Sequence, residues 1–124
     1  MKITFTELKQ TIEKLAEESP DCVYEQPVNS ICSYRRGICS NGSSGCIIGQ
    51  ACRSLGLSEN ELIDMDTYGA FMNVCTSKKF RERFFLTCSE LLWITTVQKE
   101  QDDRNSWSRA VSEANKKNAS LVWL

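Results

Sequence analysis

The 124-residue chain contains no histidine. This absence excludes Ser-His-Asp triads, Cys-His dyads, metal sites built on imidazole and histidine-based pH switches. The chain also lacks an apolar run near the roughly 20 residues that span a bilayer. Its first residues, Met1–Leu15, carry charges throughout and follow an amphipathic helical pattern, not that of a secretion signal. We therefore expect a cytoplasmic protein without a membrane partner.

An excess of charge of either sign is missing too. Fifteen basic and sixteen acidic residues leave a formal net charge of −1. Such a chain has no broad basic field with which to hold phosphate backbones, so we expect no nonspecific binding to nucleic acid. The length is that of one domain, and 41% hydrophobic residues suffice for a buried core. The oligomeric state stays open.

Seven cysteines are present, but closely spaced pairs of them are not. Cys32, Cys39, Cys46 and Cys52 are separated by six, six and five intervening residues, whereas zinc and iron–sulfur sites usually use pairs only two residues apart. An odd number of cysteines in a chain expected in the cytoplasm predicts free thiols that mostly fill the core. We predict no metal ion and no cofactor. Asp64 and Asp66 are expected to be solvated.

Apolar periodicity predicts a mainly α-helical, single compact domain of about five helices with a small β-hairpin-like insert. The first helix covers Phe5–Ala16, begins at Thr4 or Thr6 as N-cap and stops before Pro20. Short β-prone runs at 22–24 and 31–34 flank a turn signal at 27–30 and predict the hairpin. A polar loop from Arg35 to Ser44 follows.

The second half of the chain is expected to be helical almost throughout. A helix from Gly45 to Gly56 contains a Gly45/Gly49 pair that lets another backbone come close. Ser58-x-x-Glu61 is a capping box for the next short helix, which is expected to end at about Met65. The secondary structure of residues 66–77 is ambiguous from the sequence, and a further helical turn is one interpretation. The longest helix is predicted from Ser77 to Gln101, and a last helix follows from Trp107. Leu121–Leu124 forms an apolar tail.

The loop that precedes Gly45 and the helix that follows it are the most informative stretch. Backbone N–H groups at a helix start attract anions, and the same field favours a thiolate on a cysteine in the first turn. The loop lacks the Gly-Lys-Ser/Thr ending of a P-loop. The ligand-binding hypothesis that remains involves six residues: Arg35, Arg36, Ser43, Ser44, Gly45 and Cys46. No catalytic residue is assigned.

Two segments carry a resemblance. The first is Cys32-Ser-Tyr34 followed by Gly45-Cys-Ile-Ile-Gly-Gln-Ala51 with a Leu-Gly-Leu ending. The second is Val97-Gln-Lys-Glu-Gln-Asp102 followed by Trp107-Ser-Arg-Ala-Val-Ser-Glu-Ala114. Together they resemble small uncharacterised proteins of bacteriophages and actinobacteria, which share a Gly-Cys-aliphatic-aliphatic-Gly helix and a Gln-Asp…Trp…Ala-Val helix. The resemblance implies a phage-like origin but no chemistry.

Without a catalytic constellation, the expected function is non-enzymatic. The resemblance favours a small phage-type accessory protein that binds and inhibits or sequesters a host component, with defence systems among the possible targets. A first alternative is a binder of a nucleotide-like anion at the Asn41–Gly45 loop and the helix start. A second alternative is a thiol-dependent enzyme that uses Cys46. The expected partners are thus a host protein or a nucleotide-like small molecule.

Overall fold

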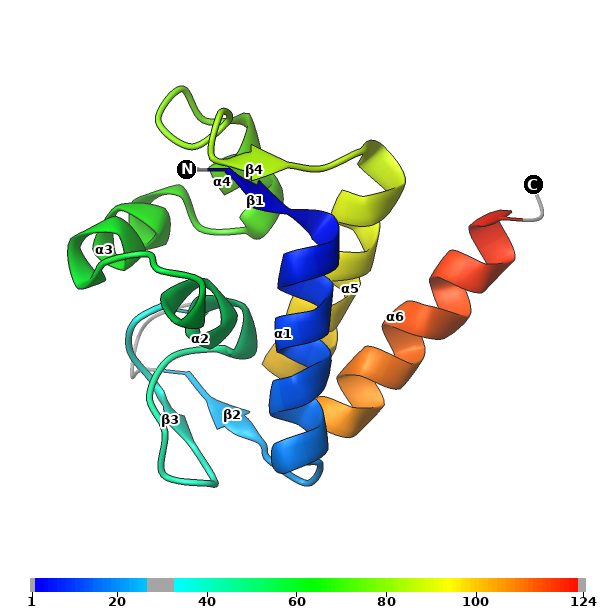
Figure 1. The fold of residues 1–124 in the computed structure, drawn as a ribbon. Helices are drawn as coiled ribbons and strands as arrows, with labels where there is room; N and C mark the ends of the chain where they lie inside the picture. Colours follow the sequence, from blue (N-terminus) through cyan, green and yellow to red (C-terminus); the bar gives the residue numbers. More distant parts are fainter. Residues whose placement is uncertain (1, 27–32, 123–124) are drawn as a thin grey trace.

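The computed structural model of the chain describes residues 2–26 and 33–122. In these residues it contains six α-helices and four short β-strands (Figure 1). The helices are α1 (Phe5–Glu18), α2 (Ile47–Ser54), α3 (Glu59–Tyr68), α4 (Phe71–Thr76), α5 (Cys88–Asp102) and α6 (Trp107–Val122). The strands are β1 (Ile3–Thr4), β2 (Tyr24–Glu25), β3 (Ile38–Cys39) and β4 (Phe84–Phe85). The expected mainly α-helical class with a small β insert is confirmed.

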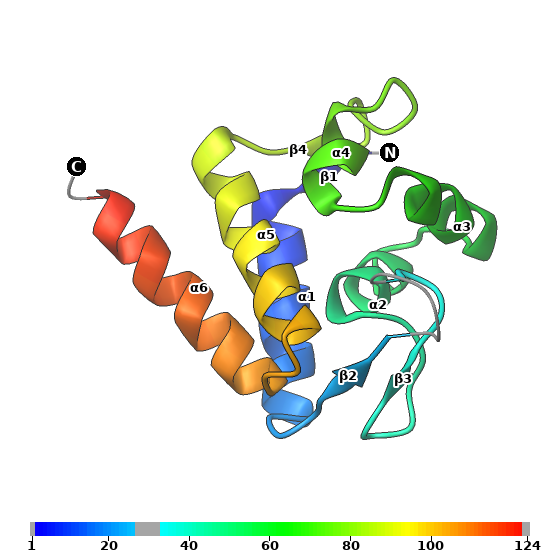
Figure 2. The same ribbon diagram turned by 180° about the vertical axis from the view of Figure 1, so that it is seen from behind.

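Helices α1 and α5 lie at the centre of the molecule, and α6 packs against them at one side (Figures 1 and 2). A tight turn joins α5 to α6, and the two helices pack together as an antiparallel pair that opens toward the C-terminus, with α1 beside them (Figures 1 and 2). Trp93 of α5 and Trp107 of α6 are fully buried, and the indole N–H of Trp93 donates to Asn115 Oδ1 of α6 at 2.9 Å. These large aromatic side chains supply much of the apolar surface that holds the helices together.

Local sequence signals set the starts of α1 and α3. The Thr4 hydroxyl accepts the Glu7 backbone N–H, and the Glu7 carboxylate accepts the Thr4 N–H at 3.1 Å, so Thr4 is the N-cap. Ser58 and Glu61 form the predicted capping box of α3. This helix extends beyond its predicted end to Tyr68, and α4 provides the further helical turn within the ambiguous segment.

The expected close backbone contact occurs between α2 and Tyr34. A Cβ atom added to Gly49 would lie 1.9 Å from the Tyr34 carbonyl oxygen, and one added to Gly45 would lie 2.5 Å from the same atom. Gly45 also has a φ of +91°, a conformation that favours glycine. These two glycines therefore let the chain around Tyr34 lie directly on the start of α2.

The hairpin prediction is wrong in its second strand. β2 pairs antiparallel with β3, so that Tyr24 lies opposite Cys39 and Glu25 opposite Ile38. Of the expected partner run, Ser33 and Tyr34 lie outside any strand, and residues 31–32 lie outside the described residues. The expected loop 35–44 consequently contains β3. The β-prone composition of 31–34 was a weak guide because strand formation depends on the pairing partner.

The long helix predicted from Ser77 to Gln101 is also wrong. Residues 77–83 form turns, and Phe84–Phe85 pairs in parallel with Ile3–Thr4 across the length of the chain. The helix α5 begins only at Cys88, where Thr87 and Glu90 form a capping box. The Thr-x-x-Glu signal was present in the sequence, but the phenylalanines at 80, 84 and 85 masked it by their helical spacing.

The C-terminal tail is described only in part. α6 continues to Val122, while Trp123 and Leu124 lie outside the described residues. Within the described part of the chain, no helix is long and apolar enough to cross a membrane.

Candidate functional site

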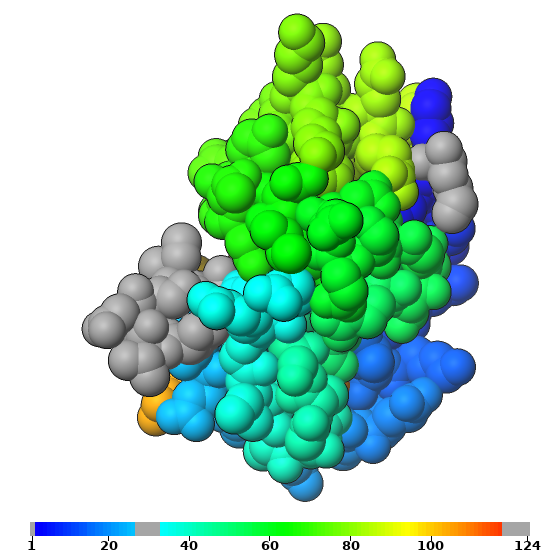
Figure 3. Space-filling model, turned by 90° about the vertical axis from the view of Figure 1, so that its left-hand side faces the viewer, coloured from blue at the N-terminus to red at the C-terminus, as the bar shows by residue number. Residues whose placement is uncertain are grey.

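The segment 33–46 wraps around the start of α2 and forms part of one face of the molecule, below α3 and α4 (Figure 3, cyan and teal). Asp66 of α3 anchors its first residues. The Asp66 carboxylate accepts the Tyr34 backbone N–H at 2.6 Å and the Ser33 hydroxyl at 2.9 Å. The expectation that Asp66 is merely solvated is therefore wrong. No feature of the sequence indicated that its partners would lie more than thirty positions earlier.

Gly45 and Cys46, two of the six candidate ligand-binding residues, are buried at the start of α2. Cys46 is the N-cap rather than a residue of the first turn, and its Sγ accepts the Gly49 N–H at 3.4 Å. The Ile47 N–H donates to the side chain of Gln101 at 3.2 Å. Two of the donors that an anion would need are therefore occupied. The fully buried Cys46 thiol also offers a substrate no surface, so the thiol-enzyme hypothesis gains no support here.

Ser43 and Ser44 take part in the structure of the loop itself. The Ser43 hydroxyl accepts a hydrogen bond from Gln50 Nε2 at 2.9 Å and donates to the Asn41 side chain. Ser44 forms an isolated antiparallel bridge with Ile38, and its carbonyl accepts a hydrogen bond from Arg53 at 3.3 Å. Both serines thus close the turn after β3.

Arg35 and Arg36 differ from the other candidates because no residue in the described part of the chain pairs with their charges. No carboxylate in residues 2–26 or 33–122 lies within ion-pair distance of either guanidinium group. Arg36 is exposed, whereas Arg35 is half-buried and its Nε has no hydrogen-bond acceptor among these residues. By contrast, Arg53 pairs with Glu59 at 2.6 Å and Arg104 pairs with Glu25 at 3.2 Å. The segment around Arg35 and Arg36 therefore carries an excess of positive charge.

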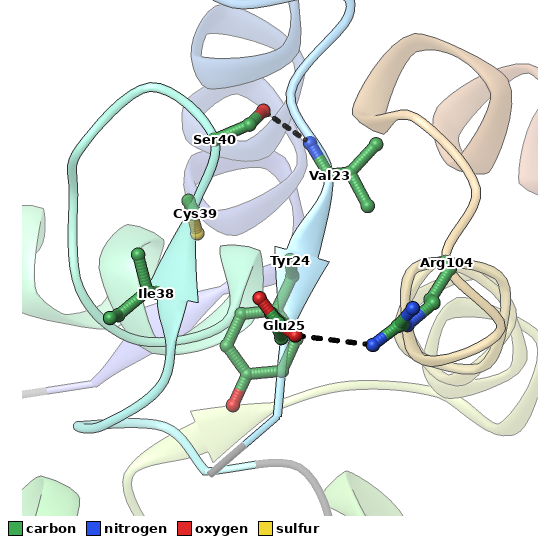
Figure 4. A pocket seen from close by; sticks show the side chains of 7 residues that line it. All are labelled: Val23, Tyr24, Glu25, Ile38, Cys39, Ser40 and Arg104. Atoms are coloured by element: carbon green, nitrogen blue, oxygen red, sulfur yellow. Dashed lines mark hydrogen bonds and ion pairs between the residues drawn. The ribbon is translucent and has the colours of Figure 1, made fainter.

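An exposed isoleucine, Ile38, follows these arginines two positions after Arg36 in the sequence. Side chains alternate along β3, so that Cys39 points inward while Ile38 points outward and is 69% exposed. Ile38 forms one wall of a shallow pocket of about 210 Å³ on the outer face of the β2–β3 ladder, and the Glu25–Arg104 ion pair forms the other wall (Figure 4). The sequence did not single out Ile38, although its place between Arg36 and the Gly/Ser loop is unusual for a large aliphatic residue.

Three of the cysteine thiols have a raised pKa. Burial raises the pKa of the Cys39 thiol to about 12, although a hydrogen bond with Ser43 opposes this effect. Burial likewise raises the pKa of Cys75 to about 12 and that of Cys52 well above its ordinary value. Among the residues that the structure describes, no three His, Cys, Asp or Glu side chains are arranged to hold a metal ion.

Three glutamines that sequence reasoning missed hold the site in place. Gln50 of α2 donates to the Gly45 carbonyl at 3.0 Å, and Gln101 of α5 accepts the first N–H of α2. Gln98 of α5 accepts the Phe71 N–H at 3.0 Å and donates to the Tyr34 hydroxyl at 3.0 Å. Each lies on the buried side of its helix. In the sequence, a glutamine at a core-facing position of a predicted helix was the signal that could have indicated this role.

Comparison with protein-family models, with curated proteins and with solved structures gave no match to this chain. The functional argument therefore rests on the residues described above.

Proposed function

We propose that this protein is a small, non-enzymatic accessory protein of phage type that binds a host protein and so inhibits or sequesters it. The binding surface consists of Arg35, Arg36 and Ile38, called here the β3 surface. The single observation that carries the proposal is the combination of a 69% exposed isoleucine with two neighbouring arginines that lack partners among the described residues.

The chemistry of the β3 surface selects the partner. Unpaired guanidinium groups favour carboxylates, which they bind bidentately, and an exposed aliphatic side chain becomes buried when it enters an apolar pocket. The partner is therefore an acidic protein surface with an apolar depression. Charge complementarity of this kind speeds association and weakens with added salt.

Affinity capture from a bacterial host lysate tests this proposal when it is made quantitative with variants. Arg36→Glu and Ile38→Asp should each lower the amount of the captured protein by about tenfold. Arg109→Glu changes the same kind of side chain at an exposed position of α6 and should leave capture unchanged. Capture should also decrease between low and high salt. The proposal is contradicted if all variants capture equal amounts of the partner, or if only the denatured protein captures it.

A nucleotide-like anion is a second candidate ligand because the buried Nε of Arg35 lacks an acceptor among the described residues. A bound phosphate group would supply that acceptor. Inorganic phosphate and nucleoside triphosphates should then raise the melting temperature of the wild-type protein, with a stabilisation that grows as the logarithm of one plus the ratio of ligand concentration to Kd. The shift should vanish in Arg35→Ala and persist in Arg109→Ala. The absence of any shift removes this candidate.

A further inference from the structure

Two buried thiols share the inner face of the β2–β3 ladder. Along β2 and the residue before it, the side chains of 22 and 24 are buried, while those of 23 and 25 are exposed to a larger degree. Cys22 therefore points to the same side as Tyr24. Because Tyr24 lies opposite Cys39 in the register, Cys22 is the diagonal neighbour of Cys39 on that face.

Backbone contacts extend the ladder toward this pair. The Ser40 N–H donates to the Val23 carbonyl at 2.9 Å, and the Val23 N–H donates to the Ser40 hydroxyl at 2.9 Å. Burial is the main cause of the raised pKa of the Cys39 thiol, and the neighbouring Cys22 thiol adds to it. Both are free thiols, and both are buried. Cys22 and Cys39 are the first and last residues of the segment 22–39, so a bond between them would close this segment into a loop.

We propose that Cys22 and Cys39 are a modification site, at which a small two-electron oxidant such as hydrogen peroxide forms an intramolecular disulfide. The bond links the chain after α1 to β3, the strand that carries Ile38. The inference is independent of the proposed function, because it concerns the inner face of the ladder and the β3 surface lies on the outer face.

The chemistry needs only the two thiols and the oxidant. The Cys22 sulfur attacks one peroxide oxygen, the O–O bond breaks, and the thiol proton leaves with the other oxygen as water, which produces a sulfenic acid. The Cys39 sulfur then attacks the Cys22 sulfur, the S–O bond breaks, and the departing hydroxide takes the Cys39 proton to form the second water. Two thiols lose two hydrogens and two electrons, and the peroxide is reduced to two waters.

Access to the buried pair is provided by local opening of the ladder. β2 and β3 contain two residues each, so few hydrogen bonds separate the closed from the open state. Short ladders of this kind open at lower free energy than the surrounding helices. Peroxide is small enough to use such openings, whereas a bulky alkylating reagent modifies the exposed Cys88 first.

Intact-mass analysis and peptide mapping of the full chain test the inference. The reduced protein is treated with a few equivalents of hydrogen peroxide, its remaining thiols are alkylated, and it is digested without reductant. We expect a mass loss of about 2 Da before alkylation and one cross-linked peptide pair that contains residues 22 and 39. The melting temperature should rise by roughly 10 °C and return when dithiothreitol is added.

Variants separate this pair from the other thiols. Cys22→Ser and Cys39→Ser should abolish both the mass loss and the rise in melting temperature, while Cys88→Ser, at an exposed position, should retain both. The mapping of the wild-type protein decides the matter even if a serine variant fails to fold. A cross-link between other cysteines, an intermolecular disulfide, or oxidation without any cross-link overturns the proposal.

Discussion

Helix α1 and the segment 33–46 are positioned in opposite ways. The start of α1 depends on neighbours in sequence, since Thr4 and Glu7 cap it three positions apart. The segment 33–46 has no regular structure except β3 and an isolated bridge at Ser44, and distant side chains hold it, among them Asp66 and Gln98. The comparison shows that the helical centre of this protein is locally encoded, whereas the candidate site depends on long-range polar contacts and on space left by glycine.

The strongest test of this difference is Gly49→Ala. The added methyl group would lie 1.9 Å from the Tyr34 carbonyl oxygen, so α2 and the segment must separate. We expect a loss of about 3 kcal/mol or more in the free energy of unfolding. Gly42→Ala is the matched control, because no atom lies within 4 Å of its added Cβ and only its φ of +89° adds strain. The control should cost about 1 kcal/mol. Urea denaturation measures both, and equal losses contradict the assigned close contact.

The next largest effect is expected from Asp66→Ala. The Tyr34 N–H and the Ser33 hydroxyl lose their acceptor, which should lower the free energy of unfolding by about 2 kcal/mol. Amide hydrogen exchange at Tyr34 should accelerate more than exchange in α1. Asp103→Ala, at an exposed position after α5, serves as the control and should change neither quantity. Unchanged protection at Tyr34 means that Asp66 does not anchor the segment.

A smaller effect is expected on the locally encoded side of the comparison. Thr4→Ala removes the N-cap of α1 and should cost about 1 kcal/mol. Thr6→Ala tests the other threonine at this helix start and should be close to neutral, because Thr6 is exposed and lies within the helix. Thermal denaturation distinguishes the two. If Thr6→Ala proves the more costly change, the cap assignment is wrong.

The smallest effect concerns pH. The backbone N–H of Ser58 and, to a lesser extent, the Arg83 guanidinium lower the pKa of Glu61 below 4.5. Because the pKa of Glu61 is lower in the folded protein, its ionised carboxylate stabilises the fold. This stabilisation is fully present above the pKa of the unfolded chain and is lost as the pH falls through the pKa of the folded protein. Wild-type stability should therefore fall more steeply below about pH 4.5 than that of Glu61→Gln. Denaturation at several pH values measures the slopes, with exposed Glu17→Gln as control; parallel slopes contradict the expectation.

The sequence predicted the helices best where a cap and an apolar stripe agreed. This holds for α1 and α3, whose capping boxes are confirmed. Prediction failed at Phe84 and Phe85, because a helical spacing of phenylalanines does not reveal a parallel pairing with residues 3 and 4. It failed again for the partner of β2, since strand pairing is a choice among distant segments. Of the candidate site, the sequence supplied the Gly45/Gly49 contact and the arginines, but not the exposure of Ile38.

By itself, the sequence determined the helical class, the caps and the absence of histidine chemistry, because these depend on composition and on residues within one or two turns of each other. Only the tertiary structure decided which polar groups meet. In the folded chain, Cys46 is buried at the start of α2, Asp66 accepts the Tyr34 N–H, and Ile38 lies on an outer face. Such contacts satisfy donors and acceptors that folding removes from water, and the partners that satisfy them come from segments whose proximity no local pattern encodes.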